Sequence, residues 1–206
     1  MIVFSNPCNP TSLGLPREEV RRLIRSVDAL VVLDEAYMDF WDQSLLGEVE
    51  DYDNLIILRT CSKAIGAAAL RLGFAVAAPR LTRVLRAVKS PYNVNSLSQA
   101  IGTLVLGERE WEAGARAQIV DSRRALQSFL ARVQEEFPGV FTLYESCTNF
   151  VFLKTGRAKE LFDGLLGRGI AVRLFNGYLR VTAGSEAENA AFLEAFTALL
   201  RGGEKA

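Results

Sequence analysis

Three short polar segments of this chain hold side chains that could do covalent chemistry. They are SNPCNPT at residues 5–11, DEAY at residues 34–37 and RTCSK at residues 59–63. Together they supply an amide, a carboxylate, a phenol, hydroxyl groups and the amine of Lys63, and Arg71 follows that lysine by eight residues. Such a set has little use in a packed core, where polar groups need partners. It fits a small anionic aromatic ligand that is bound through a lysine.

The absence of histidine narrows the chemistry further. It excludes a Ser-His-Asp or Cys-His nucleophile, a histidine zinc site and a histidine general base. Proton transfer near neutral pH must therefore use lysine, tyrosine, cysteine, a carboxylate or a cofactor. We expect no metal site.

The composition is that of a globular protein. Half of the 206 residues are hydrophobic, and 24 basic residues balance 24 acidic ones, so neither nucleic acid nor an anionic membrane is the expected partner. The three cysteines form no C-x-x-C motif, which favours a reducing compartment, with the cytoplasm as the default. No apolar run reaches the roughly 18 residues of a membrane helix, and the first residues lack the basic flank of a signal peptide.

The elements that must position the polar segments form an α/β pattern. Continuous apolar runs at 1–4, 29–33 and 55–58 are typical of strands that are buried on both faces of a parallel sheet. Helical spacing between the first two runs predicts a βαβ unit, and residues 74–78 predict another strand. The polar segments follow the carboxyl ends of the first three strands. Parallel strands would bring them to one edge of the sheet, where open α/β sheets bind ligands.

The remainder of the chain predicts a helical region from about 80 to 136, broken near Pro91, and then a small α+β portion. Ser185 and Glu188 resemble a capping box at the start of a closing helix. In the small portion we expect strands in FTLYES, NFVFL, IAVRLF and YLRVTAG, and a helix at about 158–167. The expected organisation is an α/β portion at 1–88, a helical connector at 89–137 and a small C-terminal domain at 138–206.

Six segments of the chain resemble successive blocks of the fold-type-I aminotransferases that depend on pyridoxal phosphate. In chain order they are SNPCNPT, VVLDEAY, TCSKAIGAAALRLG, PYNVNSLSQA, TNFVFLK and LRVTAG. One block alone is a weak signal, but six in the family's order are a strong one, and PYNVN favours the histidinol-phosphate aminotransferases. The resemblance implies an α/β fold, with part of the mostly parallel, cofactor-binding large domain at 1–88 and a small α+β domain at the C-terminus.

The resemblance implies roles for the residues around the cofactor ring. Lys63 would carry pyridoxal phosphate covalently and move the proton at the substrate's Cα. Asp34 would pair with the ring nitrogen. Tyr37 and Asn9 would hydrogen-bond the ring oxygen O3′, and Asn9 would also face the substrate. The plainer alternatives are a solvated lysine, a helix cap for Asp34 and simple packing for Tyr37.

The resemblance also implies which residues bind the anionic groups. Thr60, Ser62 and Arg71 would hold the cofactor phosphate, through two hydroxyls and a guanidinium. Arg180 would bind the substrate's α-carboxylate, and Arg173 would bind the substrate's phosphate. An exposed surface position is the plainer alternative for Arg71 and for Arg173.

The implied reaction is amino transfer between histidinol phosphate and 2-oxoglutarate in histidine biosynthesis, carried out by a cytoplasmic homodimer. The partners would be a phosphorylated amino substrate and a 2-oxo acid. Threonine-phosphate decarboxylase, which is expected to share Lys63, Asp34 and both arginines, stays open as an alternative. Other class I and II aminotransferases are further alternatives. A nucleotide hydrolase is a further alternative, because ALVVLDEA fits a Walker B strand, but the chain lacks a G-x-x-x-x-G-K-[ST] loop.

The chain departs from the family at three points, one of which is that GAAALRLG lacks a common glycine between Lys63 and Arg71. Ser12 stands where the family has the glycine of N-P-T-G, so we expect a slightly strained turn. The resemblance also begins well inside the family's sequences, so we expect an incomplete catalytic unit that is a poor or inactive transaminase by itself. A cofactor-binding or scaffold fragment without activity is therefore the non-enzyme alternative.

Overall fold

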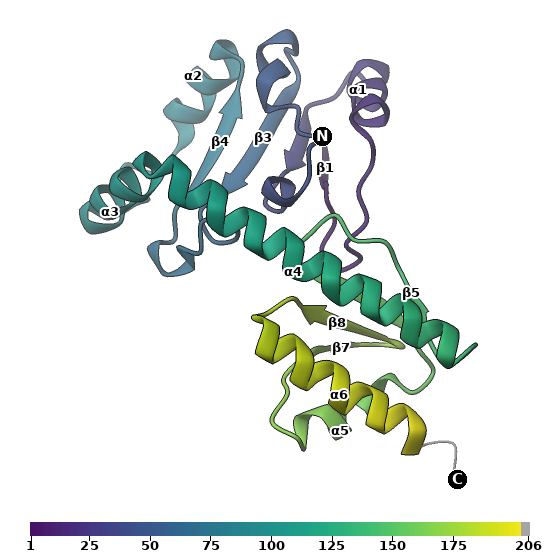
Figure 1. Ribbon diagram of the computed structural model, residues 1–206. Coiled ribbons are helices and arrows are strands. Elements are labelled where there is room, and N and C mark those ends of the chain that lie inside the picture. The colour runs from purple at the N-terminus through teal and green to yellow at the C-terminus, as the bar shows by residue number, and fades with distance from the viewer. Residues whose placement is uncertain (203–206) are drawn as a thin grey trace. The chain divides into compact units, whose positions relative to one another are not determined.

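The computed structural model describes residues 1–202, and these form two compact units. The first unit holds residues 1–9 and 14–117, and the second holds residues 10–13 and the chain from Gln118 onward. Each unit has its own four-stranded sheet (Figure 1). The division into three parts at residues 88 and 137 stays a prediction.

The sheet of the first unit has the strand order β1-β2-β3-β4. Its strands are β1 (Ile2–Ser5), β2 (Val31–Asp34), β3 (Leu55–Thr60) and β4 (Gly73–Ala77). The first three strands are parallel, and β4 runs antiparallel to β3. The four predicted strands and the parallel arrangement of the first three are thus confirmed.

One crossover helix and three short helical turns complete the sheet region of this unit. Helix α1 (Arg17–Ser26) connects β1 to β2 and buries Val20 and Ile24, which lie one turn apart on one face. The turns are η1 (Met38–Phe40), η2 (Leu46–Asp51) and η3 (Ala68–Leu70). The apolar side chains of β2 and β3 pack with those of α1 and η2 in one core.

The predicted helical region consists of α2 (Pro79–Val88), α3 (Ser96–Gly107) and α4 (Arg109–Glu136). The break near Pro91 is confirmed, since the chain leaves the helix after Val88 and Asn95 caps the next one by accepting a hydrogen bond from the Ser98 backbone N–H at 2.8 Å. Helix α4 begins in the first unit and continues into the second. None of the helices within residues 1–202 is long and apolar enough to cross a membrane.

The second unit is an antiparallel sheet packed against helices. The strand order is β5-β6-β8-β7, and the strands are β5 (Thr142–Leu143), β6 (Phe150–Lys154), β7 (Arg173–Phe175) and β8 (Tyr178–Thr182). The helices are α5 (Ala158–Leu166), α6 (Glu186–Gly202) and the second part of α4. The predicted capping box is confirmed, because the Ser185 backbone N–H donates to Glu188 Oε2 at 2.7 Å and the Glu188 backbone N–H donates to Ser185 Oγ at 3.3 Å.

The two faces of this second sheet differ in character. Val151, Leu153, Leu179 and Val181 point to one face and pack into the helical core. The opposite face carries an aromatic cluster in which the Phe152 and Tyr178 rings stack with centroids 4.9 Å apart. Arg173 and Arg180 lie on this aromatic face, because they are directly opposed to each other and Arg180 is directly opposed to Phe152.

Candidate active site

The carboxyl ends of the parallel strands lie in register, as the sequence predicted. Ser5 at the end of β1 is paired with Asp34 at the end of β2, and Asp34 is paired in turn with Leu58 of β3. The Asp34 carboxylate accepts a hydrogen bond from the Ala36 backbone N–H at 2.9 Å, which fixes the side chain in a tight turn beyond the strand. Asn9 follows β1 on an exposed loop.

Lys63 and Tyr37 lie next to each other in the first unit. The Lys63 Nζ atom is 5.1 Å from the centroid of the Tyr37 ring, within the range of a cation–π contact. Tyr37 is only 7% exposed, and Lys63 is partly buried. The structure therefore brings together two residues that the sequence assigned to one site.

The loop after β3 carries the predicted phosphate-binding residues and folds back on itself. The Ser62 backbone N–H donates to Thr60 Oγ1 at 3.1 Å, and the Cys61 backbone N–H donates to the Leu72 carbonyl at 3.0 Å. Arg71 lies in the same loop with φ +53°, and its exposed guanidinium donates to the Ala68 carbonyl at 2.9 Å. A ligand anion would have to compete with that carbonyl for the guanidinium of Arg71.

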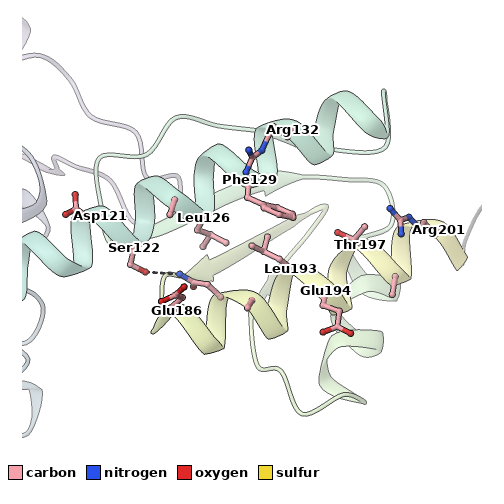
Figure 2. Close-up of a pocket in the computed structure, with 14 residues that line it drawn as sticks. Asp121, Ser122, Leu126, Phe129, Arg132, Glu186, Leu193, Glu194, Thr197 and Arg201 are labelled. Atoms are coloured by element: carbon pink, nitrogen blue, oxygen red, sulfur yellow. Dashed lines mark hydrogen bonds between the residues drawn. The ribbon is translucent and has the colours of Figure 1, made fainter.

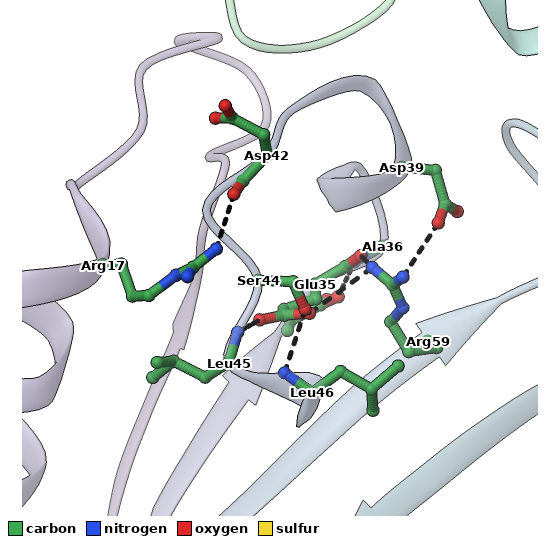
Figure 3. A network of polar contacts seen from close by, with 10 residues as sticks. Arg17, Glu35, Ala36, Asp39, Asp42, Ser44, Leu45, Leu46 and Arg59 are labelled. Carbon is green, nitrogen blue, oxygen red and sulfur yellow. Dashed lines mark hydrogen bonds and ion pairs between the residues drawn. The ribbon is translucent and has the colours of Figure 1, made fainter. Parts of the chain in front are cut away.

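Sequence reasoning missed a charged network in the first unit, formed by Glu35, Asp39 and Arg59 (Figure 3). Glu35 is fully buried, and its carboxylate accepts hydrogen bonds from Ser44 Oγ at 2.6 Å and from the Leu45 backbone N–H at 3.0 Å. Arg59 reaches Glu35 at 3.4 Å and Asp39 at 2.9 Å. Burial raises the pKa of Glu35 and the pKa of Asp39, while Arg59 lowers both.

The sequence did contain a signal for this network. Side chains alternate along a strand, so Glu35 continues the buried row of Val31 and Leu33, and Arg59 continues the row of Leu55 and Ile57. A carboxylate in a buried row needs a partner, and an arginine in the same row of the next strand can supply one.

Ser12 confirms the expected strained turn and also shows what compensates for it. Its φ is +65°, a conformation that favours glycine. Its fully buried hydroxyl lies 2.6 Å from Ser146 Oγ, 2.7 Å from Thr148 Oγ1 and 3.1 Å from the Phe150 carbonyl. All four residues belong to the second unit. A serine is thus useful here because its hydroxyl joins the loop at residues 10–13 to the start of β6.

We expect Ser12→Ala to lower the free energy of unfolding by about 1–3 kcal/mol, because alanine keeps the unfavourable φ and removes a buried hydroxyl with several partners. Ser12→Gly should cost less than Ser12→Ala, since glycine relieves the backbone strain. Urea unfolding measures both. Ser26→Ala is the control, because Ser26 is exposed and bonds only the Leu23 carbonyl at 2.9 Å. Equal losses at Ser12 and Ser26 would contradict the role of the buried hydroxyl cluster.

The two predicted substrate-binding arginines lie side by side in the second unit. Arg173 in β7 is the direct partner of Arg180 in β8, so the two strands that carry these arginines are neighbours. The Arg180 guanidinium lies 4.8 Å from the centroid of the Phe150 ring, whereas Arg173 is exposed. Two adjacent guanidiniums on one sheet face suit a doubly charged anion or two anionic groups of one ligand.

A groove of about 850 Å³ runs between α4 and α6 of the second unit (Figure 2). Leu126 and Phe129 of α4 face Leu193 of α6 across an apolar floor. Asn189 Nδ2 donates to Ser122 Oγ at 2.8 Å at one end of the groove. None of the residues that the sequence singled out for chemistry lines this groove.

The parallel strands β1 to β3, with polar residues at their carboxyl ends, are typical of α/β proteins, which bind ligands at the edge of an open sheet. The chain belongs to the aminotransferase class I and II family, whose sequence model matches residues 1–196. This family uses pyridoxal phosphate. The resemblance that the six segments indicated is thus confirmed, and the two units match part of a fold-type-I aminotransferase.

Individual relatives agree with this membership. The histidinol-phosphate aminotransferase of Clostridium novyi (strain NT) is 39% identical over 194 residues, which are 92% of this chain and 53% of that protein. The structure of histidinol-phosphate aminotransferase from Sinorhizobium meliloti in complex with pyridoxal-5'-phosphate has a TM-score of 0.85 at 23% identity, covering 97% of this chain and 57% of that one. L-threonine-O-3-phosphate decarboxylase from Porphyromonas gingivalis has a TM-score of 0.80 at 25% identity, covering 97% and 64%. The chain therefore spans little more than half of the curated relatives that it matches.

Proposed function

We propose that this chain is the part of a histidinol-phosphate aminotransferase that carries the catalytic lysine, and that the enzyme transfers the amino group between histidinol phosphate and 2-oxoglutarate. The observation that carries the proposal is the contact of Lys63 with Tyr37, next to Asp34 at the carboxyl edge of the sheet. The family membership and the 39% identity to a histidinol-phosphate aminotransferase support the choice of substrate.

The residues at the sheet edge fit pyridoxal phosphate by their chemistry. The amine of Lys63 would bind the cofactor's aldehyde, the carboxylate of Asp34 would pair with its ring nitrogen, and the phenol of Tyr37 would donate a hydrogen bond to its O3′. When bound, pyridoxal phosphate supplies an electron sink for the substrate's Cα electrons. Once the substrate's amine has displaced it from the cofactor, the freed amine of Lys63 would move a proton between the substrate's Cα and the cofactor's C4′.

The phosphate of the cofactor would be held by the loop after β3. Thr60 and Ser62 supply hydroxyls from one tight turn, in which the Ser62 backbone N–H donates to Thr60 Oγ1 at 3.1 Å. Arg71, from the same loop, would add a charge-assisted bond. Asn9, on the loop after β1, would complete the contacts to O3′ and to the substrate.

On the second unit, Arg180 would bind the α-carboxylate of the amino-acid substrate and Arg173 the phosphate of histidinol phosphate. Their direct pairing across β7 and β8 supports a shared anion-binding face. The exposed Arg173 is open to a ligand, and the packing of Arg180 on Phe150 gives its guanidinium a defined position.

In the full-length enzyme, we expect Arg173→Ala to lower kcat/KM for histidinol phosphate by about 10- to 150-fold, because a charge-assisted phosphate contact contributes about 1.5–3 kcal/mol. Activity with an unphosphorylated amine donor should change far less. Steady-state kinetics with both donors measures the difference. The matched control is Arg168→Ala, another exposed arginine of the second unit. Equal losses with both donors would show that Arg173 does not bind the phosphate.

A second candidate is decarboxylation of threonine phosphate, which the likeness to the P. gingivalis enzyme supports. The two reactions share the lysine, the aspartate and both arginines, and they differ in which Cα bond is broken. Incubation with threonine phosphate and pyridoxal phosphate separates them. Release of CO₂ without a 2-oxo acid would favour the decarboxylase, whereas glutamate formed from 2-oxoglutarate and histidinol phosphate favours the aminotransferase.

We also propose a cytoplasmic homodimer whose partners are small molecules rather than nucleic acid or membrane. The balanced charge of the chain supports small-molecule partners rather than nucleic acid or membrane. Light scattering on the purified protein tests the oligomeric state.

A further inference from the structure

The first unit contains a charged cluster that no step of the proposed reaction uses. It consists of Glu35 after β2, Asp39 in η1 and Arg59 in β3. The side chain of Glu35 is fully buried, and those of Asp39 and Arg59 are 17% and 20% exposed. Charged groups are seldom withdrawn so far from water unless they are paired.

The cluster holds both ends of the segment that carries the candidate catalytic residues. One guanidinium nitrogen of Arg59 lies 3.4 Å from the Glu35 carboxylate and 3.5 Å from the Glu35 carbonyl. The other donates to Asp39 Oδ1 at 2.9 Å. Asp34 precedes this segment and Tyr37 lies in its middle (Figure 3 shows the guanidinium between the two carboxylates).

Arginine is the side chain that suits this task. A guanidinium presents several N–H donors in a fixed plane and stays charged, so it can bind two carboxylates at once. A lysine has a single nitrogen, which cannot take both positions of the fork. The two carboxylates share one cation, so the loss of Arg59 would leave both without their charged partner.

Arg59 also links the two halves of the candidate site. It is the residue before Thr60, which is a candidate phosphate ligand, and Lys63 follows on the same loop. The segment that it holds carries Tyr37, whose ring lies 5.1 Å from Lys63 Nζ. A shift of the segment relative to β3 would therefore move Tyr37 away from Lys63 and disturb the Ala36 N–H bond that orients the Asp34 carboxylate.

We propose that Arg59 is a positioning residue, which clamps the segment from Glu35 to Asp39 onto β3 and so sets Asp34 and Tyr37 relative to Lys63. The inference rests on the proposed function for its consequence, which is tight and oriented binding of pyridoxal phosphate. The clamp itself is a property of the protein alone and can be measured without the cofactor.

The test uses Arg59→Lys, which keeps the charge but loses the two separate guanidinium nitrogens. It also uses Asp39→Asn, which weakens one of the two ion pairs of Arg59. The control is Arg21→Lys, because Arg21 is 23% exposed and also binds two carboxylates, those of Glu18 and Glu48. Hydrogen exchange of the peptide at 34–40 in cofactor-free protein measures the clamp. Titration with pyridoxal phosphate, followed by visible absorbance and circular dichroism, measures affinity and the orientation of the bound ring.

We expect exchange at 34–40 to be about tenfold faster in Arg59→Lys and somewhat faster in Asp39→Asn, with no change there in Arg21→Lys. The dissociation constant of pyridoxal phosphate should rise about 10- to 100-fold in Arg59→Lys, with weaker circular dichroism per bound cofactor. The proposal would be overturned if a folded Arg59→Lys protein exchanged at 34–40 at the wild-type rate. It would also be overturned if that protein bound pyridoxal phosphate with wild-type affinity and dichroism. If exchange is faster in Arg59→Lys but the wild-type protein does not bind pyridoxal phosphate, the result would instead overturn the proposed function.

Discussion

In the full-length enzyme, replacing Lys63 by alanine is expected to lower the rate of amino transfer by about 10³- to 10⁴-fold. The physical reason is that one amine has two tasks, to bind the cofactor covalently and to move the proton at the substrate's Cα. Its neighbours Asp34 and Tyr37 can do neither. The matched control is Lys89→Ala, because Lys89 is exposed and its Nζ donates to the Ser90 carbonyl at 3.1 Å.

The same assignment can be checked without turnover. Incubation with pyridoxal phosphate, reduction with borohydride and peptide mapping by mass spectrometry should place the label on Lys63 among the five lysines of the chain. The label should disappear in Lys63→Ala and persist in Lys89→Ala. A label on Lys89, Lys154 or Lys159 in its place would show that the site has been assigned to the wrong lysine.

Replacing Glu35 by alanine should lower the free energy of unfolding by about 3 kcal/mol. The change removes the acceptor for Ser44 Oγ and for the Leu45 backbone N–H, and leaves Arg59 with Asp39 alone. Urea unfolding of the purified protein measures the loss. Glu48→Ala is the control, because Glu48 also pairs with an arginine but is more exposed, so its loss should be much smaller. Equal losses would show that burial adds nothing at Glu35.

The contribution of Glu35 should also depend on pH with a defined sign. Burial raises the pKa of Glu35 above its ordinary value of 4.5, so the folded state keeps a proton that the unfolded chain loses first. As the pH rises from about 4.5 to the raised pKa, the stability gained from Glu35 therefore falls. Glu35→Gln has no such proton, so the stability of wild type relative to Glu35→Gln should decline across this window. A difference that grows with pH would mean that Arg59 outweighs burial.

Much of the candidate site could be predicted because its residues follow strands that the sequence marks clearly. The apolar runs before Asp34 and Thr60 predict two buried parallel strands, and parallel strands must end at a common edge. This local logic was enough to place Asp34, Tyr37 and Lys63 together. The capping box at Ser185 and Glu188 was predictable for the same reason, since its partners are three residues apart.

Other features depend on partners that are distant in the chain. The hydroxyl of Ser12 meets Ser146 and Thr148, which lie 134 and 136 positions away. The sequence could show an unfavourable residue for the turn but not the hydrogen bonds that compensate for it. The antiparallel direction of β4 could not be predicted either, because an apolar run has the same pattern in either direction.

The sequence by itself determined the kind of protein, because the order of polar segments after buried strands fixes which groups can meet at the edge of the sheet. Only the tertiary structure decided how those groups are held. Arg59 pairs with Glu35 and Asp39, which lie on a different segment. A buried charge needs a partner, and folding determines which segment lies close enough to supply it. The alternation of residues along β2 and β3 indicates that Glu35 and Arg59 lie in one buried row, but only the folded chain shows that Arg59 reaches both Glu35 and Asp39.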